Sequence, residues 1–190
     1  MRVVLLIREK KMKKKWHLYA FIISLGLIAI TLIITVYGWY VLPDIVPTHF
    51  GFSGQPDAWG HKSLFNIFFA PALQILITSL FVFLYFKPQY TNLPTTMFIM
   101  TLPEKQKEKS IELIRNVTVM TVLWVNILFA YVALMIIEGA YSNDLGYAGW
   151  GLLILIIVFL VWLVWYNIYI YKIIKKDLCR NPFTGKKIKP

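Results

Sequence analysis

The sequence contains four long apolar blocks, and these constrain the fold more than any other feature. Residues 18–42, 64–86, 116–137 and 146–171 are 22 to 26 residues long and contain no Asp, Glu, Lys or Arg. About 20 apolar residues are enough for a helix to cross the ~30 Å hydrocarbon core of a bilayer. Transmembrane barrel strands are instead segments of about 10 residues with alternating polarity. We therefore predict an all-α integral membrane protein with four transmembrane helices.

Basic residues are divided very unequally among the segments between these blocks. Segments 1–17, 87–115 and 172–190 hold 7, 5 and 7 of the 20 Lys and Arg residues, whereas segments 43–63 and 138–145 hold one, Lys62. Loops rich in Lys and Arg remain on the cytoplasmic side of a membrane. We expect both termini in the cytoplasm, a multi-pass plasma-membrane location, and an extracytoplasmic loop between the first two helices. The net charge of +11 then reflects topology and anionic lipid, so we expect no nucleic-acid partner.

The same boundaries divide the chain into five parts. We expect a basic cytoplasmic N-terminus (1–17), a helical hairpin (18–86) carrying the loop 43–63, a cytoplasmic loop (87–115), a second helical hairpin (116–171) and a basic cytoplasmic tail (172–190). Within the cytoplasmic loop, residues 104–115 have the composition of a charged helix that continues into the third transmembrane helix.

The loop 43–63 is rich in residues that restrict or extend backbone geometry. Proline fixes φ, and glycine permits conformations that other residues avoid. Such a loop is ordered, and ordered loops on rigid scaffolds often carry function. The residues expected to set its shape are Pro43, Pro47, Gly54, Pro56 and Gly60.

Two chemistries compete for the polar residues of this loop. The first is a metal site formed by His49, Asp57 and His61, since imidazole and carboxylate groups suit Zn²⁺ or a related ion. The alternative is that these side chains cap turns and bond to the backbone of the loop. Ser53 lacks the surroundings of a hydrolase nucleophile. We therefore favour a protein that is not an enzyme and has no cofactor.

The second chemistry is recognition of a ligand, and we prefer it. Its candidate residues are Asp44, His49, Asp57, Trp59 and Lys62, with Asp57 and Lys62 expected to pair across the loop. The two segments on the outer side carry four acidic residues against one lysine, so they favour a cationic ligand. Aromatic residues of the loop could anchor that ligand or could sit in the membrane interface.

The polar residues inside the apolar blocks are uncharged amides: Asn66, Gln74, Asn126 and Asn167. Buried amides usually bond between helices. Ion-driven pumps normally need a charged group within the membrane. The amides therefore predict helix packing rather than a transport path.

The loop also carries a motif that resembles a known family. The run Pro43-Asp44-x-x-Pro47-x-His49, followed by Gly54-x-Pro56-Asp57-x-Trp59-Gly60-x-Lys62, is similar to the membrane domain of unknown function numbered 1648. The resemblance covers roughly residues 25–80. In bacterial proteins of the SdpI type, this domain forms the N-terminal part of toxin immunity and signalling proteins.

The resemblance implies immunity to an antimicrobial peptide or toxin, or sensing at the cell envelope. The expected partners of the protein are the lipid bilayer, a secreted cationic peptide and a cytoplasmic protein. The alternative that remains open is a membrane enzyme or transporter using the His/Asp residues of the loop.

Overall fold

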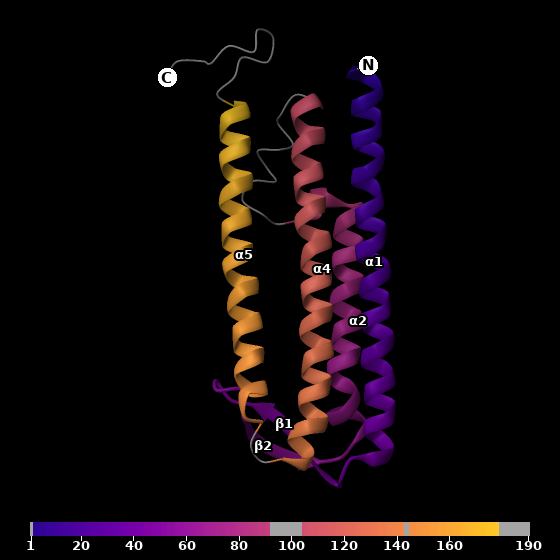
Figure 1. Ribbon diagram of the computed structural model, residues 1–190, viewed down its shortest axis with the longest axis vertical. Coiled ribbons are helices and arrows are strands. Elements are labelled where there is room, and N and C mark those ends of the chain that lie inside the picture. The colour runs from indigo at the N-terminus through magenta and orange to yellow at the C-terminus, as the bar shows by residue number, and fades with distance from the viewer. Residues whose placement is uncertain (1, 92–103, 143–144, 179–190) are drawn as a thin grey trace.

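The computed structural model describes residues 2–91, 104–142 and 145–178. Its elements in chain order are α1 (Arg2–Val41), β1 (Ile45–Phe50), β2 (Pro56–His61), α2 (Leu64–Phe86), the short 3₁₀ helix η1 (Pro88–Tyr90), α4 (Glu104–Tyr141) and α5 (Tyr147–Leu178). The four long helices run alongside one another, with β1 and β2 at one end (Figure 1). We call this the hairpin end. The start of α1 and the end of α5 are both at the opposite end, on different sides of the bundle (Figure 1).

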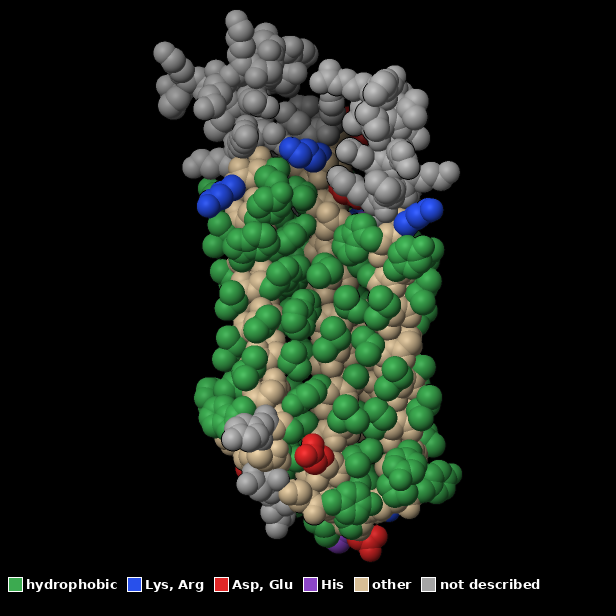
Figure 2. Space-filling model, viewed as in Figure 1, with side chains coloured by type: hydrophobic (Ala, Val, Ile, Leu, Met, Phe, Trp, Pro, Cys, Tyr) green, Lys and Arg blue, Asp and Glu red, His purple; other side chains and the backbone are tan. Residues whose placement is uncertain are grey.

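All four long helices are long and apolar enough to cross a membrane. The qualifying spans are Lys15–Val41, Leu64–Phe86, Lys107–Tyr141 and Ala148–Ile173. Hydrophobic side chains cover most of the visible face between the two ends (Figure 2). The prediction of four membrane-crossing helices is therefore confirmed at the level of length and composition.

Three helices extend further than their apolar blocks. Helix α1 begins at Arg2 and so includes most of the basic segment 1–17, while α5 continues to Leu178. Helix α4 begins at Glu104, so residues 104–115 form one helix with the apolar block that follows. These extensions contain no Gly or Pro and are rich in Lys, Arg and Glu, which are good helix formers.

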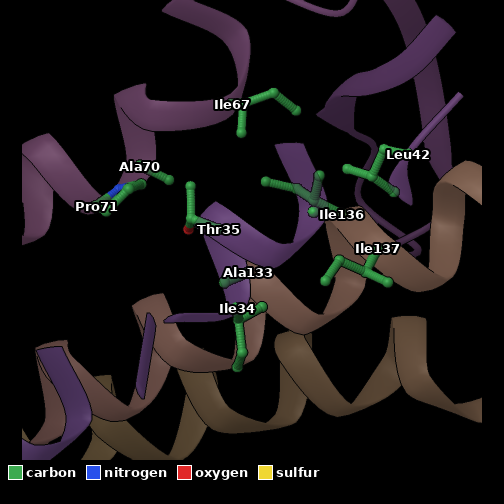
Figure 3. Close-up of a pocket in the computed structure, with 10 residues that line it drawn as sticks. Ile34, Thr35, Leu42, Ile67, Ala70, Pro71, Ala133, Ile136 and Ile137 are labelled. Atoms are coloured by element: carbon green, nitrogen blue, oxygen red, sulfur yellow. The ribbon is translucent and has the colours of Figure 1, made fainter. Parts of the chain in front are cut away.

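Helix α4 is the centre of the bundle. It contacts α1, α2, α5 and strand β1. Near the hairpin end, Thr35 of α1, Pro71 of α2 and Ala133 of α4 converge around a cavity of about 10 Å³ (Figure 3). Helix α5 packs mainly against α4, and only 6% of its membrane span is buried in the protein. The fold is thus a packed bundle of α1, α2 and α4 with α5 added to its side.

A buried hydrogen-bonded group joins α2 to α4 near the middle of the bundle. The amide of Gln74 donates to Asn126 Oδ1 at 2.8 Å, and Asn126 Nδ2 donates to Thr78 Oγ1 at 3.0 Å. Gln74 and Asn126 are completely buried. The expected bonding between helices is confirmed for this pair.

The other two amides behave differently. Asn167 donates to Leu163 O of its own helix, so the expectation of bonding between helices is wrong for Asn167. Its side chain is exposed on α5, the helix with the fewest partners. Asn66 lies at the hairpin end and donates to His61 O at 2.8 Å. It therefore supports the hairpin described below.

Candidate functional site

Residues 45–61 form an antiparallel β-hairpin. Ile45 pairs with His61 at its base, and Phe50 pairs with Pro56 next to the turn. The register shifts between Pro47 and His49 and again between His49 and Phe50. Proline cannot donate to a strand ladder and is found at edges or bulges. The irregular register therefore allows Pro47 to lie within β1.

Hydrogen bonds tie the base of the hairpin to the ends of α1 and α2. The backbone N–H of Lys62 donates to Asp44 O at 2.7 Å. Lys62 Nζ donates to Leu42 O at 2.7 Å and lies 6.0 Å from the ring centroid of Trp39. Ser63 caps α2 by accepting from the N–H of Asn66. Lysine near the C-terminus of a helix complements the partial negative charge of its last carbonyls.

The underside of the hairpin packs on the helices. Val46 is fully buried and belongs to an apolar cluster with Leu42 and Ile67. Pro47 and Pro56 face Gly139 of α4, where an added Cβ would lie 3.1 and 3.3 Å from their Cγ atoms. Both prolines thus approach α4 closely at the position of a glycine.

The tip of the hairpin docks against the connection between α4 and α5. Leu145 N donates to Gln55 Oε1 at 2.8 Å. Gly54 has φ of +73°, and a Cβ on it would lie 2.0 Å from Gly149 O. Glycine reaches this left-handed conformation without a steric penalty. The hairpin is thus attached to the helices at its base, its underside and its tip.

A hydrogen-bonded pair of histidine and aspartate side chains lies on the open surface of the hairpin. His49 Nδ1 and Asp57 Oδ1 are 2.5 Å apart, with 68% and 51% of the two side chains exposed. An added Cβ on Gly51 would lie 2.8 Å from Asp57 Oδ2, so the turn closes over this carboxylate. Phe52 in the turn is 86% exposed. Figure 2 shows acidic and histidine side chains at this end of the molecule. An accessible carboxylate and imidazole therefore share the exposed surface of the hairpin, next to a turn that carries an exposed aromatic ring, and we call this region the outer face.

The structure distributes the predicted site residues over two regions. His49 and Asp57 lie together on the outer face, and Trp59 is 40% exposed opposite Pro47 on the neighbouring strand. Asp44 and Lys62 lie at the base. The expected Asp57–Lys62 pair is wrong: Asp57 pairs with His49, and Lys62 binds the last turn of α1.

The predicted metal triad is not assembled. His61 pairs with Ile45 at the base of the hairpin, whereas His49 and Asp57 lie toward the tip. No group of three His, Cys, Asp or Glu side chains within the described ranges is arranged to hold a metal ion. Of the three side chains, those of His49 and Asp57 bond to each other within the loop.

The residues that receive the hairpin were not identified from the sequence. Gly139, Leu145 and Gly149 lie 76 or more residues beyond residue 63, in the last turn of α4, in the segment that leads into α5 and in the first turn of α5. The one available signal is the set of glycines at positions 139, 146, 149 and 151. Glycine often marks a close approach between two backbones.

The helices and the hairpin define a multi-pass α-helical membrane protein with an ordered β-hairpin at one end. Residues 26–75, from α1 through the hairpin into α2, match the family described as Domain of unknown function (DUF1648). The predicted resemblance to that domain is therefore confirmed.

One curated relative also matches. It is an uncharacterized protein of Archaeoglobus fulgidus, 36% identical over 98 residues, which cover 46% of this chain and 51% of the relative. The chain thus spans about half the length of that protein. No solved structure matches the chain.

Proposed function

We propose that this protein recognises a secreted cationic peptide or toxin at the cell surface and serves in immunity or envelope sensing. In this proposal the hairpin faces outward from the plasma membrane, and both termini lie in the cytoplasm. The 19-to-1 division of basic residues supports this orientation. The resemblance of the loop to SdpI-type proteins supports the class of function.

The attachment of the hairpin at its base, underside and tip is the observation that carries the proposal. Gly54 and Gln55 fix the tip, and Val46 fixes the underside, so the side chains of the outer face start from one arrangement. A preorganised surface loses less conformational entropy when it binds. Phe52 would then serve as an apolar anchor beside the Asp57 carboxylate.

The charge of the outer side favours a cation. Segments 43–63 and 138–145 together carry one Lys and four acidic residues, a formal charge of −3. Complementary charge raises association rates and disfavours partners of the wrong sign. A peptide rich in Lys or Arg therefore matches this side better than an anionic ligand does.

The contact between the hairpin and α5 supplies a route for sensing. The tip touches α5 at Gly149, and α5 continues to Leu178 at the opposite end of the bundle. Because α5 packs mainly on α4, a displacement at the tip can shift α5 with few other contacts to break. A cytoplasmic protein partner could then detect the position of the helix end.

A deletion strain of the source organism tests the proposal. The strain is challenged with a panel of secreted cationic peptides and complemented with wild type, Phe52→Ala or Tyr90→Ala. Tyr90 is also an exposed aromatic residue, at 64%, but lies beyond α2 at the opposite end. We expect hypersensitivity to at least one peptide, restored by wild type and Tyr90→Ala but not by Phe52→Ala. Equal sensitivity of the deletion and parent strains across the panel would contradict the proposal.

A further inference from the structure

A pocket of about 470 Å³ lies beneath the hairpin, between α2 and α4. Strand β1 forms its roof and the two helices form its walls. Pockets of this volume hold small ligands in many proteins. The residues that line it are Pro47, Thr48, Phe50, Phe65, Asn66, Phe69, Ala70, Leu73, Phe129, Val132 and Ile136.

The depth of the pocket places it within the outer part of the membrane span. Its wall on α2 runs from Phe65 to Leu73, which corresponds to about 12 Å along a helix rising 1.5 Å per residue. That is roughly two fifths of the ~30 Å hydrocarbon core. The polar lining residues, Thr48 and Asn66, both lie near the roof. Its chemistry therefore changes from polar to apolar along the direction of the membrane normal.

The pocket can be reached from the bilayer. Phe65 is 70% exposed and Phe69 is 51% exposed, and both belong to the membrane span of α2. Side chains exposed at this depth face lipid rather than water. A molecule already in the membrane can thus enter the pocket without crossing the protein.

We propose that this pocket binds an acyl chain of a membrane lipid, whose polar head lies beside Thr48 and Asn66. An acyl chain brings no polar group to the apolar walls, whereas a peptide backbone at this depth would leave N–H and C=O groups unsatisfied. No charged side chain among the described residues lines the pocket, so the walls select for an uncharged chain.

The acyl chain prefers the pocket to the bilayer because of close packing rather than because of the hydrophobic effect. Lipid tails surround the bundle on all exposed sides, so transfer from bilayer to pocket removes little apolar surface from water. The rings of Phe50, Phe69 and Phe129 instead supply close dispersion contacts on several sides of one chain. A handful of such contacts at ~0.1–0.2 kcal/mol each gives ~1 kcal/mol, which is a preference over ordinary boundary lipid of about fivefold.

The bound chain would also support the hairpin from below. Pro47 and Phe50 belong to β1 and line the pocket, whereas His49 lies on the outer face. The lipid site is therefore separate from the proposed peptide site. A negative result for peptide binding would therefore not count against the lipid site.

The full-length protein in nanodiscs containing a phospholipid with a diazirine on one acyl chain tests this proposal. Photolabelled positions are mapped by mass spectrometry. We expect labelling of residues 65–73 and 129–136 to exceed that of the exposed face of α5 by about fivefold. Labelling that is no greater there than on α5 would overturn the proposal, because ordinary boundary lipid explains it.

Two substitutions that fill the pocket distinguish labelling by a lipid bound inside it from labelling by lipid that only lies nearby. Val132→Trp and Leu73→Trp each place a large ring in the pocket from a different helix, so at least one is expected to fold with a wild-type thermal transition. Leu76→Trp is the matched control, because Leu76 is 66% exposed on α2 and lies outside the pocket. The filled variants should lose the local excess of label, and the control should keep it. Unchanged labelling in a folded filled variant would also contradict the proposal.

Discussion

Gly54 and Gly149 meet so closely that a Cβ on Gly54 would lie 2.0 Å from the carbonyl oxygen of Gly149. The first prediction concerns Gly54→Val. Valine at φ of +73° and against a backbone oxygen should weaken tip docking by ~2 kcal/mol or more. The four helices do not depend on this contact, so membrane insertion should be normal. Hydrogen exchange of residues 51–55 should accelerate by about 30-fold, since 1.4 kcal/mol is tenfold.

Gly26→Val is the control for this substitution. Gly26 lies in α1, and nothing approaches within 4 Å of its added Cβ. Its hairpin exchange rates should equal those of wild type. Wild-type protection of the tip in Gly54→Val would show that the two backbones are not in contact.

The hydrogen bond between the side chains of His49 and Asp57 gives the second prediction. Because both side chains are more than half exposed, Asp57→Asn should change stability by less than ~1 kcal/mol. Affinity for a cationic peptide identified by the panel should fall by about tenfold or more, because a charge-assisted contact is lost. Isothermal titration calorimetry measures the affinity, and thermal unfolding in detergent measures the stability.

Glu138→Gln removes an acidic charge from the same end of the molecule without changing the hairpin. Glu138 is exposed in α4, outside β1 and β2. Its peptide affinity should fall much less than that of Asp57→Asn. Equal losses in the two variants would mean that net charge, and not the outer face, determines binding.

The buried pair of Gln74 and Asn126 gives the third prediction. Asn126→Ala removes hydrogen bonds to Gln74, Thr78 and the backbone of Val122. Bonds between membrane helices average ~0.6 kcal/mol and reach ~1.7, so a loss of ~1–2 kcal/mol is expected. Reversible unfolding in SDS measures this loss.

A double-mutant cycle with Gln74→Ala isolates the direct interaction. The combined loss should be smaller than the sum of the two single losses, because each variant alone leaves a buried amide without its partner. Strict additivity would contradict the bond between Gln74 and Asn126.

The helices could be predicted from the sequence because a segment that crosses lipid must meet simple requirements of length and composition. Blocks such as 64–86 must be long, apolar and uncharged, and α2 begins and ends where its block does. The helical extension of α1 was less readable, because a basic segment without Gly or Pro is equally compatible with a flexible tail. Composition therefore located the spans better than the ends of the helices.

The hairpin could be predicted from the sequence only in part. Its prolines and glycines indicated order, but Pro47 and Pro56 argue against strands, and both lie in strands. The pairing of Asp57 depends on the register, which places it near His49 and away from Lys62. Docking of Gly54 on Gly149 joins residues 95 positions apart. No local pattern specifies a contact of that kind.

The central claim is that a rigid hairpin faces outward, where a peptide can reach it. Labelling of single cysteines with a membrane-impermeant maleimide, in a Cys179→Ser background, tests this most directly. Phe52→Cys marks the hairpin and Tyr90→Cys marks the opposite end; both native residues are exposed, at 86% and 64%. We expect Phe52→Cys to react in intact cells and Tyr90→Cys to react only after permeabilisation. Reaction of Tyr90→Cys in intact cells, with Phe52→Cys protected, would contradict the account.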